Sequence, residues 1–272
     1  MKKYGFDYYE WQEDIIDPNV LGEDELTFSV LKSIVNHKSS KVFTDGRNVI
    51  ICYSCSPFPV WVWVGPEVSP EQLHSVAECL VEEFPAAEGY TFNLSYELLE
   101  KLKTVNTVLE NLTVKINMLT YRCDNVRKPD KYCDGKARLA ADGEVELLSH
   151  WIQEGAYEIE QLEPTLEECR RRAEEKIAAG ELFVWENGNG ELVAMAIEDD
   201  EERYSKVTSV YTLPAERRKG YGLHLVHRIT EEIRKKGNVP ILYTDADYPA
   251  SNECYKKIGY VQVGSLCKVW QQ

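Results

Sequence analysis

The chain has 272 residues and a formal net charge of −15, with 43% hydrophobic and 28% charged residues. This length is close to the size at which one hydrophobic core divides into two, so we expect two domains. The acidic balance argues against nucleic acid as a partner, because binding to phosphates needs a basic surface that displaces counterions.

Hydropathy and cysteine content indicate the cellular compartment and whether a metal site is expected. No apolar run approaches the ~20 residues that span a bilayer, and residues 1–7 lack the apolar segment of a signal peptide. We expect a cytoplasmic protein that binds no membrane, with its eight cysteines as reduced thiols. Cys52 and Cys55 have no second pair at zinc-ligand spacing, and His224 and His227 have no matching ligand nearby, so no metal site is predicted.

Hydrophobic spacing predicts the elements of the first half. Helices are expected over 23–35, from Pro70 onward and over 96–103, and strands over 42–44, 49–53, 60–64 and 113–121. Trp61 and Trp63 lie in the third of these strands, either as core residues or as one wall of an acceptor site. The polar segment 126–136 is the predicted linker between domains at 1–125 and 137–272.

The second half alternates between strands and helices. Strands are expected over 138–140, 182–185, 191–197, 205–212 and 240–244, helices over 144–154, 165–179 and 251–258, and a final hairpin over 260–270. A further amphipathic helix begins near Gly220 and ends at Gly237, since Leu223, Val226 and Ile229 recur at helical spacing and Pro240 follows.

The clearest chemical signal is the loop that leads into this helix. Its residues are Arg217, Arg218, Lys219, Gly220, Tyr221, Gly222 and Leu223. The first amides of a helix lack intrahelical acceptors and carry partial positive charge, so they bind phosphate oxygens, and glycine allows a close approach. Three adjacent cations reverse the sign of an otherwise acidic chain. We predict an anion site at this helix start.

A second motif lies downstream, in Tyr243-Thr244-Asp245 and in the run 249–260. With both motifs, the chain from about residue 137 to its end resembles the GNAT superfamily of acetyl-coenzyme A (acetyl-CoA) dependent N-acetyltransferases. The resemblance implies an α/β (α+β) fold, with a central mixed, mostly antiparallel sheet flanked by helices. The smaller α/β amino-terminal domain resembles a degenerate acetyltransferase-like half that lacks the glycine loop.

The resemblance also implies the site residues. The strand before the loop pairs its backbone with the pantetheine arm of coenzyme A, and the loop wraps the pyrophosphate. The matching positions are Val210, Tyr211 and Thr212 in the strand, Arg217, Arg218, Lys219, Gly220, Tyr221, Gly222 and Leu223 in the loop, and Asn252 as a further cofactor contact. Tyr255 matches the tyrosine that serves as the general acid.

The chemistry is consistent with that assignment. A phenol with a pKa near ~10 is protonated at neutral pH and can protonate a departing thiolate. The acceptor amine, with a pKa of about 10.4, must lose a proton before it attacks, and Glu198 and Glu216 are the candidate bases.

Several alternatives stay open at this stage. Tyr255 could be a packing residue, Asn252 a helix cap, and the three cations a solvated surface. The chain could also be a non-catalytic regulator that binds acyl-CoA, or the glycine loop could be a nucleotide site, although the preceding strands lack the parallel β–α alternation of a dinucleotide fold. The sequence does not identify the acceptor, which is a small-molecule or peptide amine. Residues 155–164 are a candidate for one of the loops that bind it. The sequence does not determine the oligomeric state either.

Overall fold

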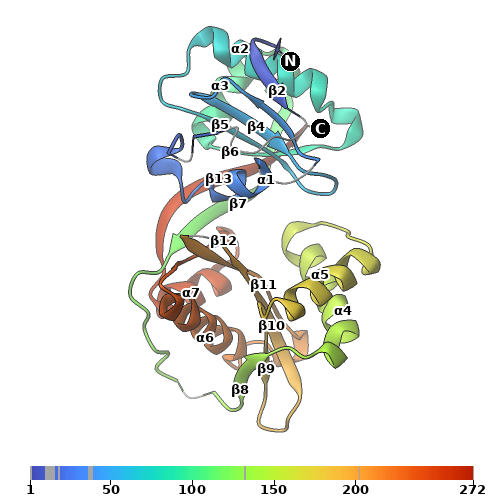
Figure 1. Cartoon of the computed structure of the whole chain (residues 1–272), viewed down its shortest axis with the longest axis vertical. Helices are drawn as coiled ribbons and strands as arrows, with labels where there is room; N and C mark the ends of the chain where they lie inside the picture. The colour runs from blue at the N-terminus through green and yellow to red at the C-terminus, as the bar shows by residue number, and fades with distance from the viewer. Residues whose placement is uncertain are drawn as a thin grey trace. The chain divides into compact units, whose positions relative to one another are not determined.

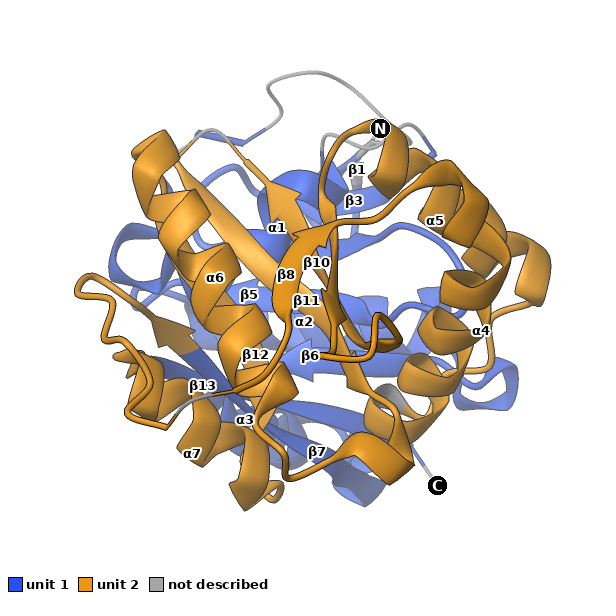
Figure 2. Ribbon diagram, turned by 90° about the horizontal axis from the view of Figure 1, so that it is seen from below, with its two compact units in different colours: residues 1–120, 263–272 blue, residues 121–262 orange. Residues whose placement is uncertain are grey.

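The computed structural model of the chain describes residues 2–9, 16–17, 19–35, 39–131, 133–201 and 203–271 (Figure 1). It divides into two compact units, one formed by residues 1–120 with 263–272 and the other by residues 121–262 (Figure 2). The predicted domains, 1–125 and 137–272, follow a different division at the carboxyl end. The last residues belong to the first unit because Cys267 and Val269 pair with Leu94 and Phe92.

The first unit is an α/β layer structure. Its strands are β1 (Lys2–Lys3), β2 (Phe6–Tyr9), β3 (Lys41–Thr44), β4 (Val49–Tyr53), β5 (Val60–Val64) and β6 (Thr91–Leu94), followed in the sheet by β13 (Val261–Gln271). Its helices are α1 (Ser29–Val35), α2 (Pro70–Glu83) and α3 (Tyr96–Val105). The strands pair antiparallel except β5 and β6, which are parallel and therefore need the crossover helix α2.

Local chemistry explains the first-unit hairpin and its core. The Asp45 carboxylate accepts hydrogen bonds from the amides of Arg47, Asn48 and Val49, which closes the turn between β3 and β4. Apolar residues of α2 and α3 pack on one face of the sheet with residues of β3 to β6. Trp61 and Trp63 are buried core residues, and Trp63 Nε1 donates to Asp24 Oδ2 at 3.0 Å.

Two sequence predictions in this unit are wrong. The helix predicted over 23–35 is α1, which begins only at Ser29, after a 3₁₀ turn at Gly22–Asp24. The hairpin predicted over 260–270 is the single long strand β13. Gly264 makes no turn there; it allows a close approach, since a Cβ at this position would lie 2.0 Å from Thr27 Oγ1.

The second unit carries a mostly antiparallel sheet. Its strands are β8 (Lys136–Leu139), β9 (Leu182–Glu186), β10 (Leu192–Asp200), β11 (Tyr204–Thr212) and β12 (Val239–Asp245), with neighbours in the order β12-β11-β10-β9-β8. Its helices are α4 (Val145–Gly155), α5 (Leu166–Ala178), α6 (Tyr221–Lys236) and α7 (Pro249–Ile258). β7 (Leu112–Arg122) and β13 each begin in one unit and end in the other.

Helices cover both faces of this second sheet. Met195 and Ile197 of β10 pack with α4 and α5, whereas Glu198 bonds to Lys236 of α6 on the opposite face. The described part of the predicted linker, 126–131 and 133–136, belongs to this unit. Within it, Arg127 N donates to Ile258 O at 2.7 Å, and Asp134 accepts from Tyr221 and Gly188.

The two units repeat one order of elements. The first contains β3-β4-β5-α2-β6-α3 and the second β9-β10-β11-α6-β12-α7. In each, two antiparallel pairs are followed by a helix and then by a strand parallel to the third strand of the series. The same arrangement of a strand end and a helix start therefore occurs twice in the chain.

Candidate functional site

The site begins where β11 and β12 separate. Their parallel ladder has three residue pairs, from Tyr204 with Val239 to Lys206 with Ile241. Beyond it, β11 stays paired with β10 on its other side, with Tyr211 opposite Met195. Within the described residues of these strands, the backbone edge of 207–212 that faces β12 is thus outside the ladder. An unpaired strand edge offers N–H and C=O groups to an extended ligand.

A β-bulge interrupts β11 in the middle of this open edge. The pairing passes from Thr208 with Ile197 to Tyr211 with Met195, so β11 carries one extra residue. Ser209 adopts a left-handed backbone conformation, with φ of 49°. Bulges of this kind change the direction of backbone groups and occur often beside active sites. The peptide groups around Val210 therefore point differently from those of a regular strand.

The helix α6 begins at the carboxyl end of the same strand. Its N-cap is Gly220, with φ of 97° and no side-chain cap, and the first intrahelical bond runs from His224 N to Gly220 O at 3.0 Å. The amides of Tyr221, Gly222 and Leu223 consequently have no acceptor within the helix. A Cβ on Gly222 would lie 3.1 Å from Thr212 Oγ1, so glycine permits the helix start to sit against the strand end.

The three loop cations are in different situations. Arg217 makes a bidentate pair with Glu158, with both N–O distances 2.7 Å, and its Nε donates to Thr212 O at 3.0 Å. Lys219 pairs with Glu216 at 2.8 Å. Arg218 is exposed and has no ion pair with any described residue. Arg218 is thus the cation of the three that can reach an incoming anion without breaking a pair.

The Tyr221 side chain is hydrogen-bonded within the second unit. Its hydroxyl donates to Asp134 Oδ1 at 3.0 Å, and burial raises its pKa to about 12. The Asp134 carboxylate also accepts from Gly188 N, and its backbone oxygen accepts from Trp185 Nε1. Tyr221 therefore anchors the first turn of α6 through its side chain, while its backbone amide has no acceptor within the helix.

Tyr255 lies on α7 in an aromatic cluster. It is 8% exposed, with the rings of Tyr121 and Tyr260 at centroid distances of 6.4 and 6.1 Å. Burial raises the pKa of its phenol well above the ordinary value, and neighbouring Cys254 and Tyr248 act in the same direction. The phenol is therefore protonated at neutral pH, which is the form that a general acid requires.

Asn252 holds the turn between β12 and α7. Its Nδ2 donates to the carbonyl oxygens of Asp245 and Tyr248 at 2.8 and 3.0 Å. Its Oδ1 is buried and has no hydrogen-bond partner among the described residues. The residue predicted to contact the cofactor thus has its donor committed to the turn and its buried acceptor without a partner among the described residues.

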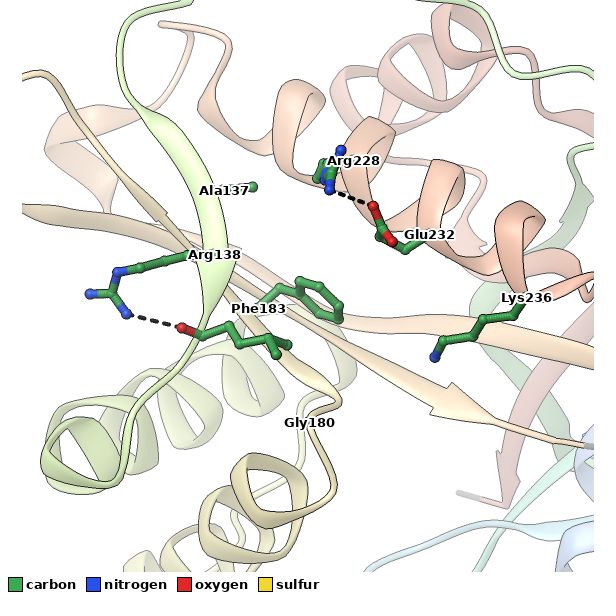
Figure 3. A pocket seen from close by; sticks show the side chains of 8 residues that line it. Ala137, Arg138, Gly180, Phe183, Arg228, Glu232 and Lys236 are labelled. Carbon is green, nitrogen blue, oxygen red and sulfur yellow. Dashed lines mark hydrogen bonds and ion pairs between the residues drawn. The ribbon is translucent and has the colours of Figure 1, made fainter.

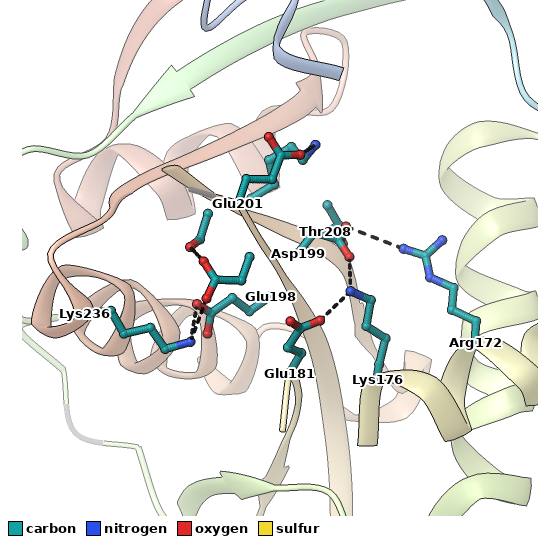
Figure 4. Close-up of polar contacts among 11 residues, drawn as sticks. Arg172, Lys176, Glu181, Glu198, Asp199, Glu201, Thr208 and Lys236 are labelled. Atoms are coloured by element: carbon teal, nitrogen blue, oxygen red, sulfur yellow. Dashed lines mark hydrogen bonds and ion pairs between the residues drawn. The ribbon is translucent and has the colours of Figure 1, made fainter. Parts of the chain in front are cut away.

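The two predicted bases are both ion-paired. Glu198 is fully buried on the α6 face of the sheet and accepts from Lys236 Nζ at 2.7 Å (Figure 4). Burial raises the pKa of its carboxyl, although Lys236 opposes the shift. Glu216 is the partner of Lys219 in the loop. Neither carboxylate is brought to the open edge of β11 with its charge unpaired.

Two carboxylates near the site were missed by the sequence analysis. Glu154 lies in the last turn of α4 and accepts from the Tyr211 hydroxyl, and Glu158 lies in the following π-helical turn, Ala156–Glu160, where it pairs with Arg217. Their spacing of four residues places them on one side of the helix end. The sequence shows that spacing, but it does not show their partners, which lie 57 and 59 residues away along the chain.

A separate pocket of about 320 Å³ lies between β8 and α6 (Figure 3). Phe183 faces into it, and Arg228 and Lys236, which line it, are paired with Glu232 and Glu198. It shares no lining residue with the open edge of β11 or the start of α6. Across the described residues, no cluster of histidine, cysteine and acidic side chains could hold a metal ion. None of the described helices has the length and apolar character to cross a membrane.

Comparison with known proteins defines the fold. Residues 183–270 match the family model described as FR47-like protein. A GNAT-family acetyltransferase structure from Colwellia psychrerythraea has 14% identity and a TM-score of 0.61, covering 98% of this chain and all of that one. A GCN5-related N-acetyltransferase from Sphaerobacter thermophilus has 13% identity and a TM-score of 0.67, covering 89% of this chain and 84% of that one.

A third similar structure is a putative acetyltransferase from Pyrococcus horikoshii, with 12% identity and a TM-score of 0.58, covering 99% of this chain and 90% of that one. No curated protein matches the sequence. The structural matches extend over both halves of the chain and confirm the predicted α+β fold, including the acetyltransferase-like order of elements in the amino-terminal half.

Proposed function

From a chain with the GNAT acetyltransferase fold and an FR47-like region at residues 183–270, we propose an N-acetyltransferase that passes the acetyl group of acetyl-CoA directly to a primary amine. The observation that carries the proposal is the combination of an open β11 edge and an uncapped α6 start at one strand end. An extended amide-bearing arm fits the first, and a pyrophosphate fits the second.

The residues present fit coenzyme A. The amides of Tyr221, Gly222 and Leu223 and the exposed Arg218 form the pyrophosphate cradle, while the backbone of Val210 to Thr212 pairs with the pantetheine arm. Asn252 offers its unpartnered Oδ1 to a donor of the cofactor. When bound, the thioester supplies an activated acetyl group.

We assign the proton delivery to Tyr255. Its buried, protonated phenol would donate a proton to the coenzyme A sulfur as the acceptor nitrogen bonds to the acetyl carbon and the carbon–sulfur bond breaks. The acceptor must arrive with its lone pair free, so its proton leaves to water or to a carboxylate. Glu154, exposed beside Tyr211, is better placed for this task than the ion-paired Glu198 and Glu216.

Calorimetry and mass spectrometry test the proposal together. The protein is titrated with coenzyme A, NAD and ATP, and is then incubated with acetyl-CoA and a library of small-molecule and peptide amines. We expect binding of coenzyme A alone among the three and an acetylated amine with release of free thiol. Binding of coenzyme A with slow, acceptor-independent hydrolysis and no acetylated product would favour a regulator that senses acyl-CoA. Binding of ATP or NAD instead would reject the proposal.

A further inference from the structure

The guanidinium of Arg217 joins two segments of the second unit. Its Nη1 and Nη2 donate to the two carboxylate oxygens of Glu158, and its Nε donates to the carbonyl oxygen of Thr212. The same guanidinium lies over the Tyr211 ring, 5.8 Å from the ring centroid. A bidentate pair of this kind fixes orientation as well as distance. The side chain is therefore held in one place at the last residues of β11.

A second hydrogen bond also joins the end of β11 to the carboxyl end of α4. The Tyr211 hydroxyl donates to Glu154, four residues before Glu158 on the same helix end. Between these carboxylates α4 changes into the π-helical turn Ala156–Glu160, which ends at Gln161 with φ of 53°. Such turns are uncommon and often occur at functional positions. The end of β11 thus contacts the π-helical turn Ala156–Glu160, which lacks the regular hydrogen bonding of α4.

We propose that Arg217 is a positioning residue, and that its pairing with Glu158 sets the Thr212 carbonyl and the end of β11 against the π-helical turn. This inference rests on the proposed function, because it concerns how the pantetheine strand is held. Three of the five guanidinium N–H donors and the whole charge are committed within the protein. The pyrophosphate is then left to Arg218 and the helix amides.

The experiment compares coenzyme A with pantetheine, which is the thiol-bearing arm of coenzyme A alone. Coenzyme A carries in addition the pyrophosphate and the phosphorylated adenosine. Affinities at 25 °C are measured by calorimetry for coenzyme A and by displacement for pantetheine, in the wild type, Arg217→Gln and the matched neighbour Arg218→Gln. Arg217→Gln should weaken both ligands by the same factor, about tenfold for the loss of a charge-assisted pair. Arg218→Gln should weaken coenzyme A and leave pantetheine unchanged.

Glu158→Gln provides the second arm. If Arg217 positions the strand, Glu158→Gln lowers the affinity for both ligands as Arg217→Gln does. The double variant then has the same affinities as the more affected single variant. If Arg217 binds phosphate instead, Glu158→Gln frees its charge and tightens coenzyme A. Thermal unfolding of each variant is recorded alongside, because a purely structural role lowers the Tm and leaves both affinities at 25 °C unchanged.

The outcomes separate this inference from the proposed function. Suppose that the wild type binds coenzyme A and that Arg217→Gln lowers the affinity for coenzyme A but not for pantetheine. This result would overturn the positioning role and leave the cofactor assignment intact. A lowered Tm with unchanged affinities would also overturn it. Failure of the wild type to bind coenzyme A would reject both proposals.

Discussion

At the scale of single residues, the second unit separates its tyrosines by environment. Tyr221 is committed to Asp134 and Tyr211 to Glu154, so each phenol already has a carboxylate acceptor. Tyr255 has neighbouring rings and no side-chain hydrogen bond among the described residues. A buried phenol without an acceptor keeps its proton and can donate it to a transient base. This is the physical basis for assigning the acid role to Tyr255.

Replacing Tyr255 by phenylalanine tests that role. Tyr255→Phe keeps the aromatic packing and removes the proton donor, so we expect kcat to fall about 100-fold while the affinity for coenzyme A changes by less than about twofold. The matched control is Tyr248→Phe, since Tyr248 is a neighbouring phenol that is 54% exposed. A large fall in kcat for Tyr248→Phe with full activity in Tyr255→Phe would transfer the acid role to Tyr248.

The raised pKa of Tyr255 also predicts the alkaline limb of the pH profile. A general acid works in its protonated form, which is populated below its pKa, and burial moves that pKa upward. Loss of kcat through deprotonation of Tyr255 is therefore expected only above about pH 10. A pH–rate profile at saturating substrates measures it. A loss centred below pH 10 that disappears in Tyr255→Phe would contradict the assignment.

At the scale of elements, the two helices that follow the third strand of each series differ in how they begin. In α2, Ser69 Oγ accepts from Gln72 N at 3.2 Å and Gln72 Oε1 accepts from Ser69 N at 2.8 Å, with Pro70 at the first position. That capping box takes up the Ser69 and Gln72 amides, and Pro70 has no N–H, so fewer donors are left for an anion. In α6, the glycine N-cap leaves them open. The glycine loop is thus what leaves the start of α6 open, whereas the start of α2 is capped.

The two ends of α6 allow a matched test of the loop. Gly220 and Gly237 cap the helix with φ of 97° and 92°, so alanine is similarly strained at both, at a cost of roughly 1 kcal/mol in the free energy of unfolding. We expect both Gly220→Ala and Gly237→Ala to lower the Tm, and only Gly220→Ala to weaken coenzyme A, by at least about tenfold. Calorimetry and thermal unfolding measure the two effects. Equal affinities in the two variants would remove the helix start from the cofactor site.

At the scale of the whole molecule, the chain contains two units with one order of elements and one glycine loop. The corresponding loop of the first unit, residues 65–69, is Gly-Pro-Glu-Val-Ser, and Glu71 follows in the first turn of α2. Carboxylates and a closed capping box at this position disfavour a pyrophosphate. The first unit therefore has the same order of elements without the open helix start, so we expect no anion site in it.

We accordingly expect one coenzyme A per chain. A calorimetric titration of the full chain should give a stoichiometry of one, and Gly220→Ala should weaken that single event. A stoichiometry of two, or a tight site that survives Gly220→Ala unchanged, would show that the first unit also binds the cofactor.

Sequence patterns were most informative where the relevant forces are local. The helical spacing of Leu223, Val226 and Ile229 predicted α6, because this signal lies within a few residues. The strand β6, of four residues, carried too short a pattern and was missed. The hairpin predicted over 260–270, which contains Gly264, was wrong. The reason for this glycine is its close contact with Thr27, and residues adjacent in the sequence give no signal of that contact.

The loop at 217–223 shows the same division between local and long-range information. The sequence alone determined that a helix start rich in glycines and cations follows a β-branched strand, because these residues and the helical periodicity are adjacent in the chain. Only the tertiary structure decided which of the cations is available. Arg217 is occupied by Glu158 and Arg218 is exposed, and this difference arises from a contact across 59 residues that folding brings together.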